Sequence, residues 1–215
     1  MGLTLHSYWR ATAPFRVRIG LALKGLPYDY APVNLLKGEQ GADPYRGRFN
    51  RQALVPALET EGGVLTQSLA ILEWLEETHP EPPLLPKDAF GRAVVRALAL
   101  VVACDIHPLN NLRILRALDG LGHPQGGADQ LAWGQRWIND GFAALEPMVA
   151  EHGAGFAFGE TPTLADCVIY PQLWSSSRFD VDLAPYPALA ALFDRLSAHP
   201  AVQSAHPDRQ PDAAA

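Results

Sequence analysis

The sequence has 215 residues, of which 48% are hydrophobic and 19% charged, a profile typical of one large globular domain or two small ones. Its formal net charge of −6 disfavours a protein that coats nucleic acid or an anionic membrane, so we expect neither as a partner. The two cysteines, Cys104 and Cys167, are too few for a disulfide framework and lie in no metal-ligand spacing, which favours a reducing compartment and no metal site.

The N-terminal residues MGLTLHSYWR lack the charged and apolar regions of a secretory signal. The apolar run ALALVVAC, residues 97–104, is far too short to span a bilayer. We therefore expect a cytoplasmic protein.

The first eighty residues alternate strand and helix patterns. A strand is predicted at LTLHSYW (3–9), followed by a helix at FRVRIGLALKG (15–25) that Gly25 ends. Further strands are predicted at PYDYAPVNL (27–35), ALVPALET (53–60) and GVLTQ (63–67), the last two joined by a tight turn at EGG. A helix with Ser68 as its N-cap follows at SLAILEWLEETH (68–79). The predicted order is β-α-β, a loop with a short helix, then β-β-α.

The stretch PEPPLLPKD (80–88) holds four prolines and predicts a stiff linker. We expect one domain at residues 1–80, a linker at 81–86 and an all-helical domain at 87–215. Its predicted helices cover residues 90–108, with an end or kink near Pro108, and then 110–118, 128–152 and 163–179, with one or two more in 186–205. The polar tail from residue 206 is predicted to be mobile.

Three arginines, Arg10, Arg16 and Arg18, crowd the start of the first predicted helix. Cations are unfavourable at that end of the helix macrodipole, so we expect an anionic ligand to dock there. Arg16 and Arg18 are each predicted to be solvated surface charges, pairing with acids such as Asp29. Cys104, in a long apolar helix, is predicted to be a buried structural thiol.

This two-domain pattern resembles the soluble glutathione transferases, which have an α/β thioredoxin-like N-terminal domain and an all-α C-terminal domain. Three motifs carry the resemblance. LVPAL (54–58) is similar to the family's Val-Pro pair, in which the proline is cis. TQSLAILEWLEE (66–77) is similar to the step that binds the γ-glutamyl end of glutathione, and TPTLADC (161–167) to a helix capping motif.

Within the family, the sequence is most similar to the zeta class. The stretches YWR…RVRIGLALKG, CDIHPLNNLRIL, RFDVDLAPYP and HPDRQPD carry this likeness. The class includes maleylacetoacetate isomerase and the bacterial maleylpyruvate isomerases. The resemblance implies a homodimeric, glutathione-dependent cis–trans isomerase of aromatic-compound catabolism, with glutathione as coenzyme and a small dicarboxylate as substrate. Two alternatives remain open: a general glutathione transferase acting on small electrophiles, and a catalytically inert binding or regulatory protein of the same fold.

The resemblance also implies roles for individual residues. Arginine binds a carboxylate through two parallel hydrogen bonds, which suits a substrate with two carboxylates. A solvated surface arginine, a helix-capping histidine and an ordinary serine cap are the competing interpretations. The implied glutathione-binding residues are Gln52, Val55, Gln67, Ser68 and His107, and the implied substrate-binding residues are Arg10, Asn111, Arg113 and Arg178.

The sequence departs from the class at one place. Zeta enzymes carry Ser-Ser-Cys after the position of Arg10, whereas this chain has Ala11, Thr12 and Ala13. The hydroxyl there donates a hydrogen bond to the glutathione thiolate and lowers its pKa. We expect Thr12 and Arg10 to be the catalytic residues, with the positive end of the following helix also favouring the thiolate.

Overall fold

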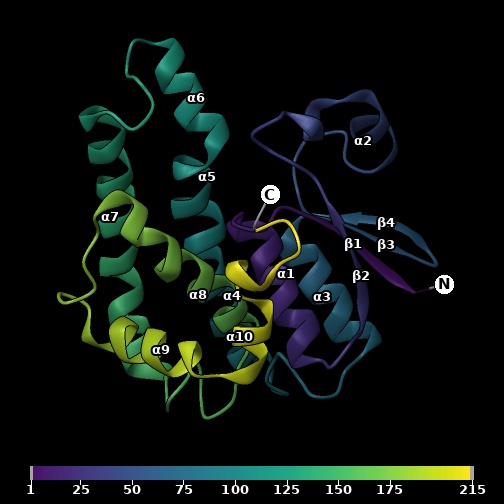
Figure 1. Ribbon diagram of the computed structural model, residues 1–215. Helices are drawn as coiled ribbons and strands as arrows, with labels where there is room; N and C mark the ends of the chain where they lie inside the picture. The colour runs from purple at the N-terminus through teal and green to yellow at the C-terminus, as the bar shows by residue number, and fades with distance from the viewer. Residues whose placement is uncertain (1, 214–215) are drawn as a thin grey trace. The chain divides into compact units, whose positions relative to one another are not determined.

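The structure is a computed structural model and describes residues 2–213. The described residues form two compact units, one made of 2–84 together with 198–213 and the other of 85–197 (Figure 1). The first boundary lies within the predicted linker. The C-terminal sixteen described residues, expected in the helical domain, belong instead with the N-terminal unit.

The first unit is built on a four-stranded sheet of order β2-β1-β3-β4. Its strands are β1 (Leu3–Ser7), β2 (Tyr28–Pro32), β3 (Ala57–Thr60) and β4 (Gly63–Thr66). β1 pairs parallel to β2 and antiparallel to β3, and β3 and β4 form the predicted hairpin. The predicted β-α-β and β-β-α order, and with it the thioredoxin-like fold of this domain, is confirmed.

Two helices, α1 (Thr12–Leu23) and α3 (Ser68–Thr78), lie on one side of this sheet, and the short α2 (Asp43–Arg48) lies on the other (Figure 1). A 3-10 turn, η1 (Glu39–Gly41), precedes α2. α1 and α3 pack closely because Gly20 leaves room for Leu72, whose side chain a Cβ at Gly20 would overlap. α1 and α3 are thereby fixed relative to each other.

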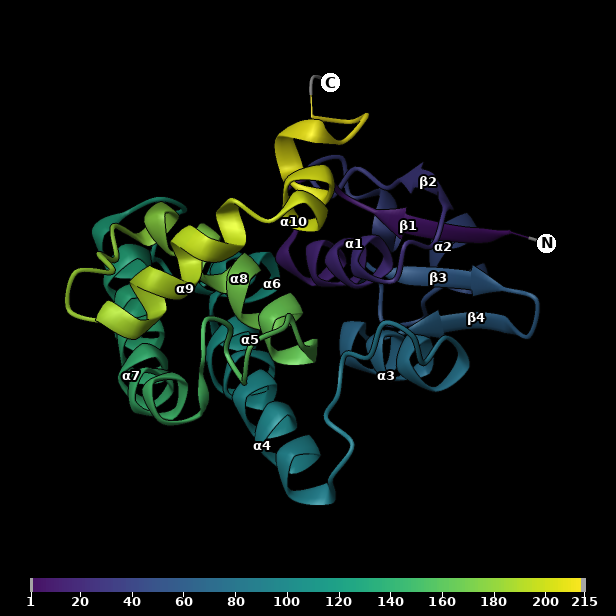
Figure 2. The same ribbon diagram turned by 90° about the horizontal axis from the view of Figure 1, so that it is seen from below.

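The C-terminal segment of the chain completes the first unit. α10 (Pro200–Ala205) packs against α1, as Figure 2 shows, and the 3-10 turn η4 (Pro207–Arg209) follows it. Within the described part of the tail, Gln210 is buried and Asp212 accepts hydrogen bonds from Trp9 and Tyr30. The expectation of a mobile tail is therefore wrong for residues 206–213, and residues 214–215 lie outside the described part.

The second unit is helical throughout, as predicted. It contains α4 (Ala89–Leu100), α5 (His107–Asn110), α6 (Leu112–Gly120), α7 (Ala128–His152), α8 (Leu164–Ser176) and α9 (Pro187–Ser197). The predicted cap at TPTLADC is present at the start of α8: Thr163 and Asp166 form a capping box. A 3-10 turn, η3 (Ser177–Phe179), extends α8.

The predicted kink near Pro108 takes the form of a π-helical segment, η2 (Val101–Ile106), between α4 and α5. Proline has no N–H, so Pro108 cannot donate to the carbonyl of Cys104 four residues earlier, and the α-helical ladder is interrupted there. π-Helical turns of this kind are frequent at functional sites. Among residues 2–213, no helix is long and apolar enough to cross a membrane.

Candidate functional site

The turn between β1 and α1 presents Arg10. A hydrogen bond from the Ala11 N–H to the Tyr8 carbonyl, 3.0 Å long, closes the turn and leaves Trp9 and Arg10 at its centre. Arg10 is exposed, and its guanidinium lies 5.9 Å from the centroid of the Trp9 ring. Thr12, the first residue of α1, is only 7% exposed. The arginine and the threonine hydroxyl thus lie at the positive end of one helix macrodipole.

Arg16 and Arg18 do not lie on the surface, and that expectation is wrong. Arg16 is 3% exposed and donates to the Ser68 hydroxyl at 3.3 Å, which carries positive charge to the start of α3. Arg18 is fully buried and donates to Ser7, Trp9 and Ala205. Both arginines follow the inward face of α1, because that helix is covered by α3 and α10. The sequence pattern alone could not show whether these two arginines lie on a buried or an exposed face of the helix.

The start of α3 carries Gln67 and Ser68. Gln67 is the N-cap, with a positive φ of 68°, and Ser68 is the first helical residue, so the predicted cap at Ser68 lies one residue too late. No side-chain cap bond is formed there. The N–H groups of the first helical turn therefore receive no capping hydrogen bond from the Gln67 side chain. Such a helix start is suited to binding a carboxylate.

The loop before β3 places Gln52 beside the start of α3. The Gln67 side-chain amide donates to the Gln52 side-chain oxygen at 2.7 Å, although the two residues lie fifteen positions apart. Asn50, which is 3% exposed, holds the loop by donating to the Leu54 carbonyl and accepting from the Gln52 N–H. Val55 follows Leu54, and the Val55–Pro56 peptide is cis, as the resemblance implied.

Asn50 and Tyr45 are supporting residues that sequence reasoning missed. The Tyr45 hydroxyl donates to the Leu54 carbonyl at 2.8 Å, and burial raises the pKa of that hydroxyl. The same carbonyl therefore accepts from two buried side chains, which fixes the chain just before Val55. An asparagine directly before a turn is a signal for such a contact, because its side chain bonds the backbone two residues on.

In the second unit, Asn111 caps α6. Its side-chain oxygen accepts from the N–H groups of Arg113 and Ile114, and its amide nitrogen donates to the Pro108 carbonyl. An amide nitrogen carries two donors, and this bond uses one of them. Arg113 is exposed on the first turn of α6, and His107 is the first residue of α5. One short stretch of chain thus carries all three predicted residues.

This stretch is anchored to α7 by two side chains that the sequence did not single out. The Trp133 indole donates to the Leu109 carbonyl at 2.7 Å. Gln130, which is 3% exposed, donates to the carbonyls of Leu115 and His123. Because all three bonds end on backbone oxygens, they fix the path of α5 and α6 rather than particular side chains. The anchoring limits how far the predicted binding residues can move.

Arg178 lies in η3, immediately after α8, and is exposed. Its guanidinium stacks over the Trp174 ring, 4.4 Å from the centroid, which orients the planar group. Cys104 is exposed rather than buried, so the prediction of a buried thiol is wrong there; Cys167 is the buried cysteine. The apolar helix that suggested burial becomes the π-helical segment η2, which turns Cys104 outward.

The sequence and the fold match a known class of protein. Residues 14–83 match the N-terminal domain of glutathione S-transferases, and residues 130–205 match their C-terminal domain. A maleylpyruvate isomerase from Ralstonia is 48% identical over 99% of this chain and all of its own. A maleylacetoacetate isomerase from Pseudomonas aeruginosa is 43% identical over 98% of each chain. The chain therefore belongs to the glutathione S-transferase family and, within it, to the zeta class of maleylpyruvate and maleylacetoacetate isomerases.

Solved structures agree with this placement. The holo form of a bacterial zeta-class maleylpyruvate isomerase superposes with a TM-score of 0.92 at 47% identity, covering 97% of this chain and 99% of that one. A maleylacetoacetate isomerase from Anaeromyxobacter dehalogenans superposes with a TM-score of 0.88 at 47% identity, covering 99% and 97%. That enzyme holds dicarboxyethyl glutathione and citrate in its active site.

Proposed function

We propose that this protein is a glutathione-dependent cis–trans isomerase that converts maleylpyruvate or maleylacetoacetate to the fumaryl isomer in aromatic-compound catabolism. The observation that carries the proposal is the likeness to the Ralstonia maleylpyruvate isomerase, which extends over the whole length of both chains at 48% identity. When bound, glutathione supplies a thiolate nucleophile whose reversible addition to the maleyl double bond permits rotation about it.

The first unit offers groups of the kind that glutathione needs. Glutathione has a γ-glutamyl end with a carboxylate and an ammonium group, and the start of α3 combines the Gln67 amide, the Ser68 hydroxyl and the Arg16 charge. Gln52 and Val55 face the same ligand in our proposal, Gln52 toward the glycyl end and Val55 through its backbone. His107 of the second unit is assigned as a further glutathione ligand. The donor set therefore fits the coenzyme.

A binding measurement tests the glutathione assignment. Ser68→Ala removes one hydroxyl at the start of α3 and should weaken glutathione binding by about 1–3 kcal/mol, the scale for a lost charge-assisted hydrogen bond. Calorimetry of the wild type and the variant measures this difference. Unchanged affinity would remove Ser68 from the site.

The arginines supply the second part of the function. A maleyl substrate carries two carboxylates and a keto group, and we assign Arg10 and Arg178 to the carboxylates, with Arg113 as a further cation. Asn111 has one amide N–H beyond its bond to Pro108, and we assign that donor to the keto oxygen. Arg10, Thr12 and the α1 N-terminus stabilise negative charge on the coenzyme sulfur. We further propose a cytoplasmic homodimer.

Ala11 and Ala13 favour a second candidate, a general glutathione transferase acting on small electrophiles, because the hydroxyl and thiol usual in the class are missing there. The purified protein should isomerise maleylpyruvate or maleylacetoacetate only when glutathione is present, which an absorbance assay follows. Glutathione consumption with a haloacid, and no isomerisation of either maleyl substrate, would instead establish the transferase.

A further inference from the structure

The turn that presents Arg10 is held in part by side chains from outside the turn. Its own hydrogen bond joins Tyr8 to Ala11, so the backbone groups of Trp9 need partners from elsewhere. The Trp9 N–H donates to the Asp212 carboxylate at 3.1 Å, and the Trp9 carbonyl accepts from the Arg18 guanidinium at 2.8 Å. Both polar groups of the residue before Arg10 are therefore held by charged side chains.

Arg18 links this turn to the C-terminal segment. Its three nitrogens donate to Ala205 at 2.9 Å, Ser7 at 3.1 Å and Trp9 at 2.8 Å, so one fully buried side chain joins α10, the end of β1 and the turn. Burial lowers the pKa of Arg18 to about 10, and the nearby Asp212 charge opposes that shift. A buried cation contributes less stability than a well-packed apolar side chain of the same volume. The rigid, planar guanidinium instead holds its three acceptors in a fixed arrangement.

Asp212 reaches the turn from the other end of the chain. One carboxylate oxygen accepts from the Tyr30 hydroxyl of β2 at 2.6 Å, and the other accepts from the Trp9 N–H. The segment 205–212 thus contacts the turn twice, through Arg18 and directly. Figure 2 shows α10, in yellow, beside α1, with the segment continuing from α10 toward the C-terminus.

We propose that the C-terminal segment 205–212 positions the catalytic turn, with Arg18 and Asp212 as positioning residues that set the place of Arg10. The inference rests on the proposed function, because it assigns Arg10 to the reacting groups. Arg18 and Asp212 touch neither substrate nor coenzyme in this proposal. They hold the Trp9 peptide, and the direction of the next side chain follows from that peptide.

Substitution of Asp212 tests the proposal in the full-length protein. Asp212→Ala removes both acceptors, and Asp212→Asn keeps one oxygen that can accept from Trp9 or Tyr30. Asp208→Ala is the matched control, because Asp208 is exposed on the same segment. A catalytic group displaced by about 1 Å loses roughly 100-fold in rate. We expect kcat of Asp212→Ala to fall about 10- to 100-fold, that of Asp212→Asn to fall less, and that of Asp208→Ala to match the wild type.

Two further readouts separate positioning from simple destabilisation. At acidic pH, where the bound thiol is protonated, glutathione affinity depends on the α3 side of the unit in our proposal, and it should stay close to that of the wild type in Asp212→Ala. The pKa of the bound thiol, followed by thiolate absorbance, should rise because Arg10 is displaced. A lower melting temperature with unchanged kcat, KM and thiol pKa would overturn the proposal. Arg18→Lys, if folded by circular dichroism, should show the same pattern as Asp212→Ala.

The proposed function can fail separately. If the wild type isomerises neither maleyl substrate with glutathione, the isomerase assignment is wrong, and the positioning role is then decided by hydrogen exchange. The Trp9 amide should exchange faster in Asp212→Ala than in the wild type and in Asp208→Ala. Equal protection in all three proteins would overturn the positioning role whatever the activity.

Discussion

Four arginines, Arg10, Arg16, Arg18 and Arg178, differ in where their guanidinium groups lie. Arg18 is fully buried with three neutral acceptors, Arg16 is buried beside Ser68, and Arg10 and Arg178 are exposed, each next to a tryptophan ring. A planar guanidinium can bind a carboxylate through two parallel hydrogen bonds. The exposed Arg10 and Arg178 are therefore suited to binding carboxylates, whereas the fully buried Arg18 is suited to holding the protein scaffold.

For Arg178, we expect substitution to affect the maleyl substrate and not the coenzyme. Arg178→Ala should raise KM or lower kcat, giving a loss in kcat/KM of about 10-fold or more, the scale of one charge-assisted contact. Glutathione affinity should stay near the wild-type value. Arg116→Ala, which removes an exposed arginine of α6, is the control. Wild-type kinetics in Arg178→Ala would remove this residue from the site.

We expect Thr12 and Arg10 to make separable contributions to stabilising the coenzyme thiolate. Thr12→Val keeps the shape of the side chain and removes only the hydroxyl donor, so the pKa of the bound thiol should rise. Activity at neutral pH should then fall and recover in part at higher pH. We expect Arg10→Ala to raise that pKa further, because Ala11 and Ala13 offer no hydroxyl in its place. Titration of thiolate absorbance in both variants measures the two shifts. A thiol pKa in the wild type equal to that of free glutathione contradicts both assignments.

At the scale of single elements, the start of α8 depends on one buried carboxylate. Asp166 has no exposed surface, and it accepts from the Ala157 N–H at 2.8 Å, the Thr163 N–H at 2.7 Å and the Thr163 hydroxyl at 2.8 Å. Burial raises the pKa of Asp166 to about 6, and these hydrogen bonds oppose the rise. The cap thus joins α8 to the loop that precedes it.

The raised pKa of Asp166 predicts a pH dependence of stability. Between the unfolded pKa of 3.8 and the folded pKa of about 6, the folded state holds a proton that the unfolded state has released. The contribution of Asp166 to stability is therefore largest below about pH 4, falls as the pH rises to about 6, and is constant above that. The free energy of unfolding of the wild type, relative to Asp166→Asn, should drop by about 2 kcal/mol from pH 4 to pH 7.

Denaturant unfolding of both proteins across this pH range makes the comparison. Asp194→Asn, which changes an exposed carboxylate of α9, should follow the wild type at every pH. A stability difference between the wild type and Asp166→Asn that does not change with pH would contradict the raised pKa.

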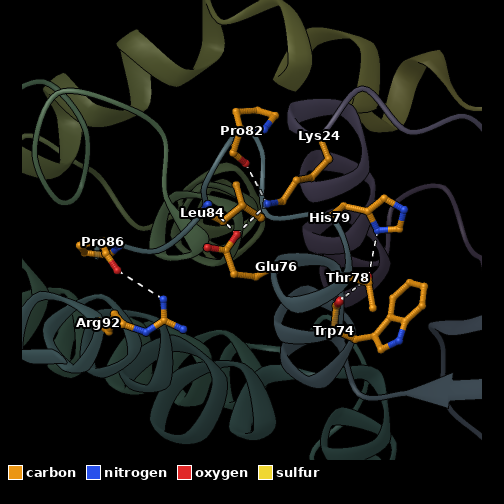
Figure 3. Close-up of polar contacts among 9 residues, drawn as sticks. All are labelled: Lys24, Trp74, Glu76, Thr78, His79, Pro82, Leu84, Pro86 and Arg92. Atoms are coloured by element: carbon orange, nitrogen blue, oxygen red, sulfur yellow. Dashed lines mark hydrogen bonds and ion pairs between the residues drawn. The ribbon is translucent and has the colours of Figure 1, made fainter. Parts of the chain in front are cut away.

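At the scale of the whole molecule, the segment that leaves the first unit is held by a buried ion pair. The Lys24 ammonium donates to the Glu76 carboxylate at 2.6 Å and to the Pro82 carbonyl at 2.8 Å, and the Leu84 N–H donates to the same carboxylate oxygen at 2.8 Å (Figure 3). Lys24 ends α1, and Glu76 lies in α3. The predicted linker is therefore fixed to the first unit at two points, in addition to being stiffened by its prolines.

Removing one partner of this pair should be more harmful than removing both. Glu76→Ala leaves a buried ammonium without its carboxylate and should lower the free energy of unfolding by about 3–5 kcal/mol. The double variant Lys24→Met with Glu76→Leu should lose much less, because neither charge is left buried. Glu77→Ala, an exposed neighbour on α3, is the control. Chemical denaturation of the four proteins makes the comparison, and a double variant no more stable than Glu76→Ala would contradict the cost assigned to the unpaired buried ammonium.

The sequence alone was sufficient for the elements and the family. Strand and helix periodicity located the four strands and all the long helices, since those patterns repeat within a few residues. The resemblance to the family placed the Val55–Pro56 cis peptide and the capping box of Thr163 and Asp166. The interruption near Pro108 followed from the proline itself, which lacks the N–H that an α-helix needs.

Tertiary structure decided what long-range packing controls. No local pattern shows that Arg18 is buried, because its acceptor Ala205 lies 187 positions away, or that Asp212 reaches Trp9 across 203 positions. The same limit explains the tail predicted to be mobile and the thiol of Cys104 predicted to be buried. Burial depends on which elements cover a side chain, and that is fixed only when segments distant in the chain pack together.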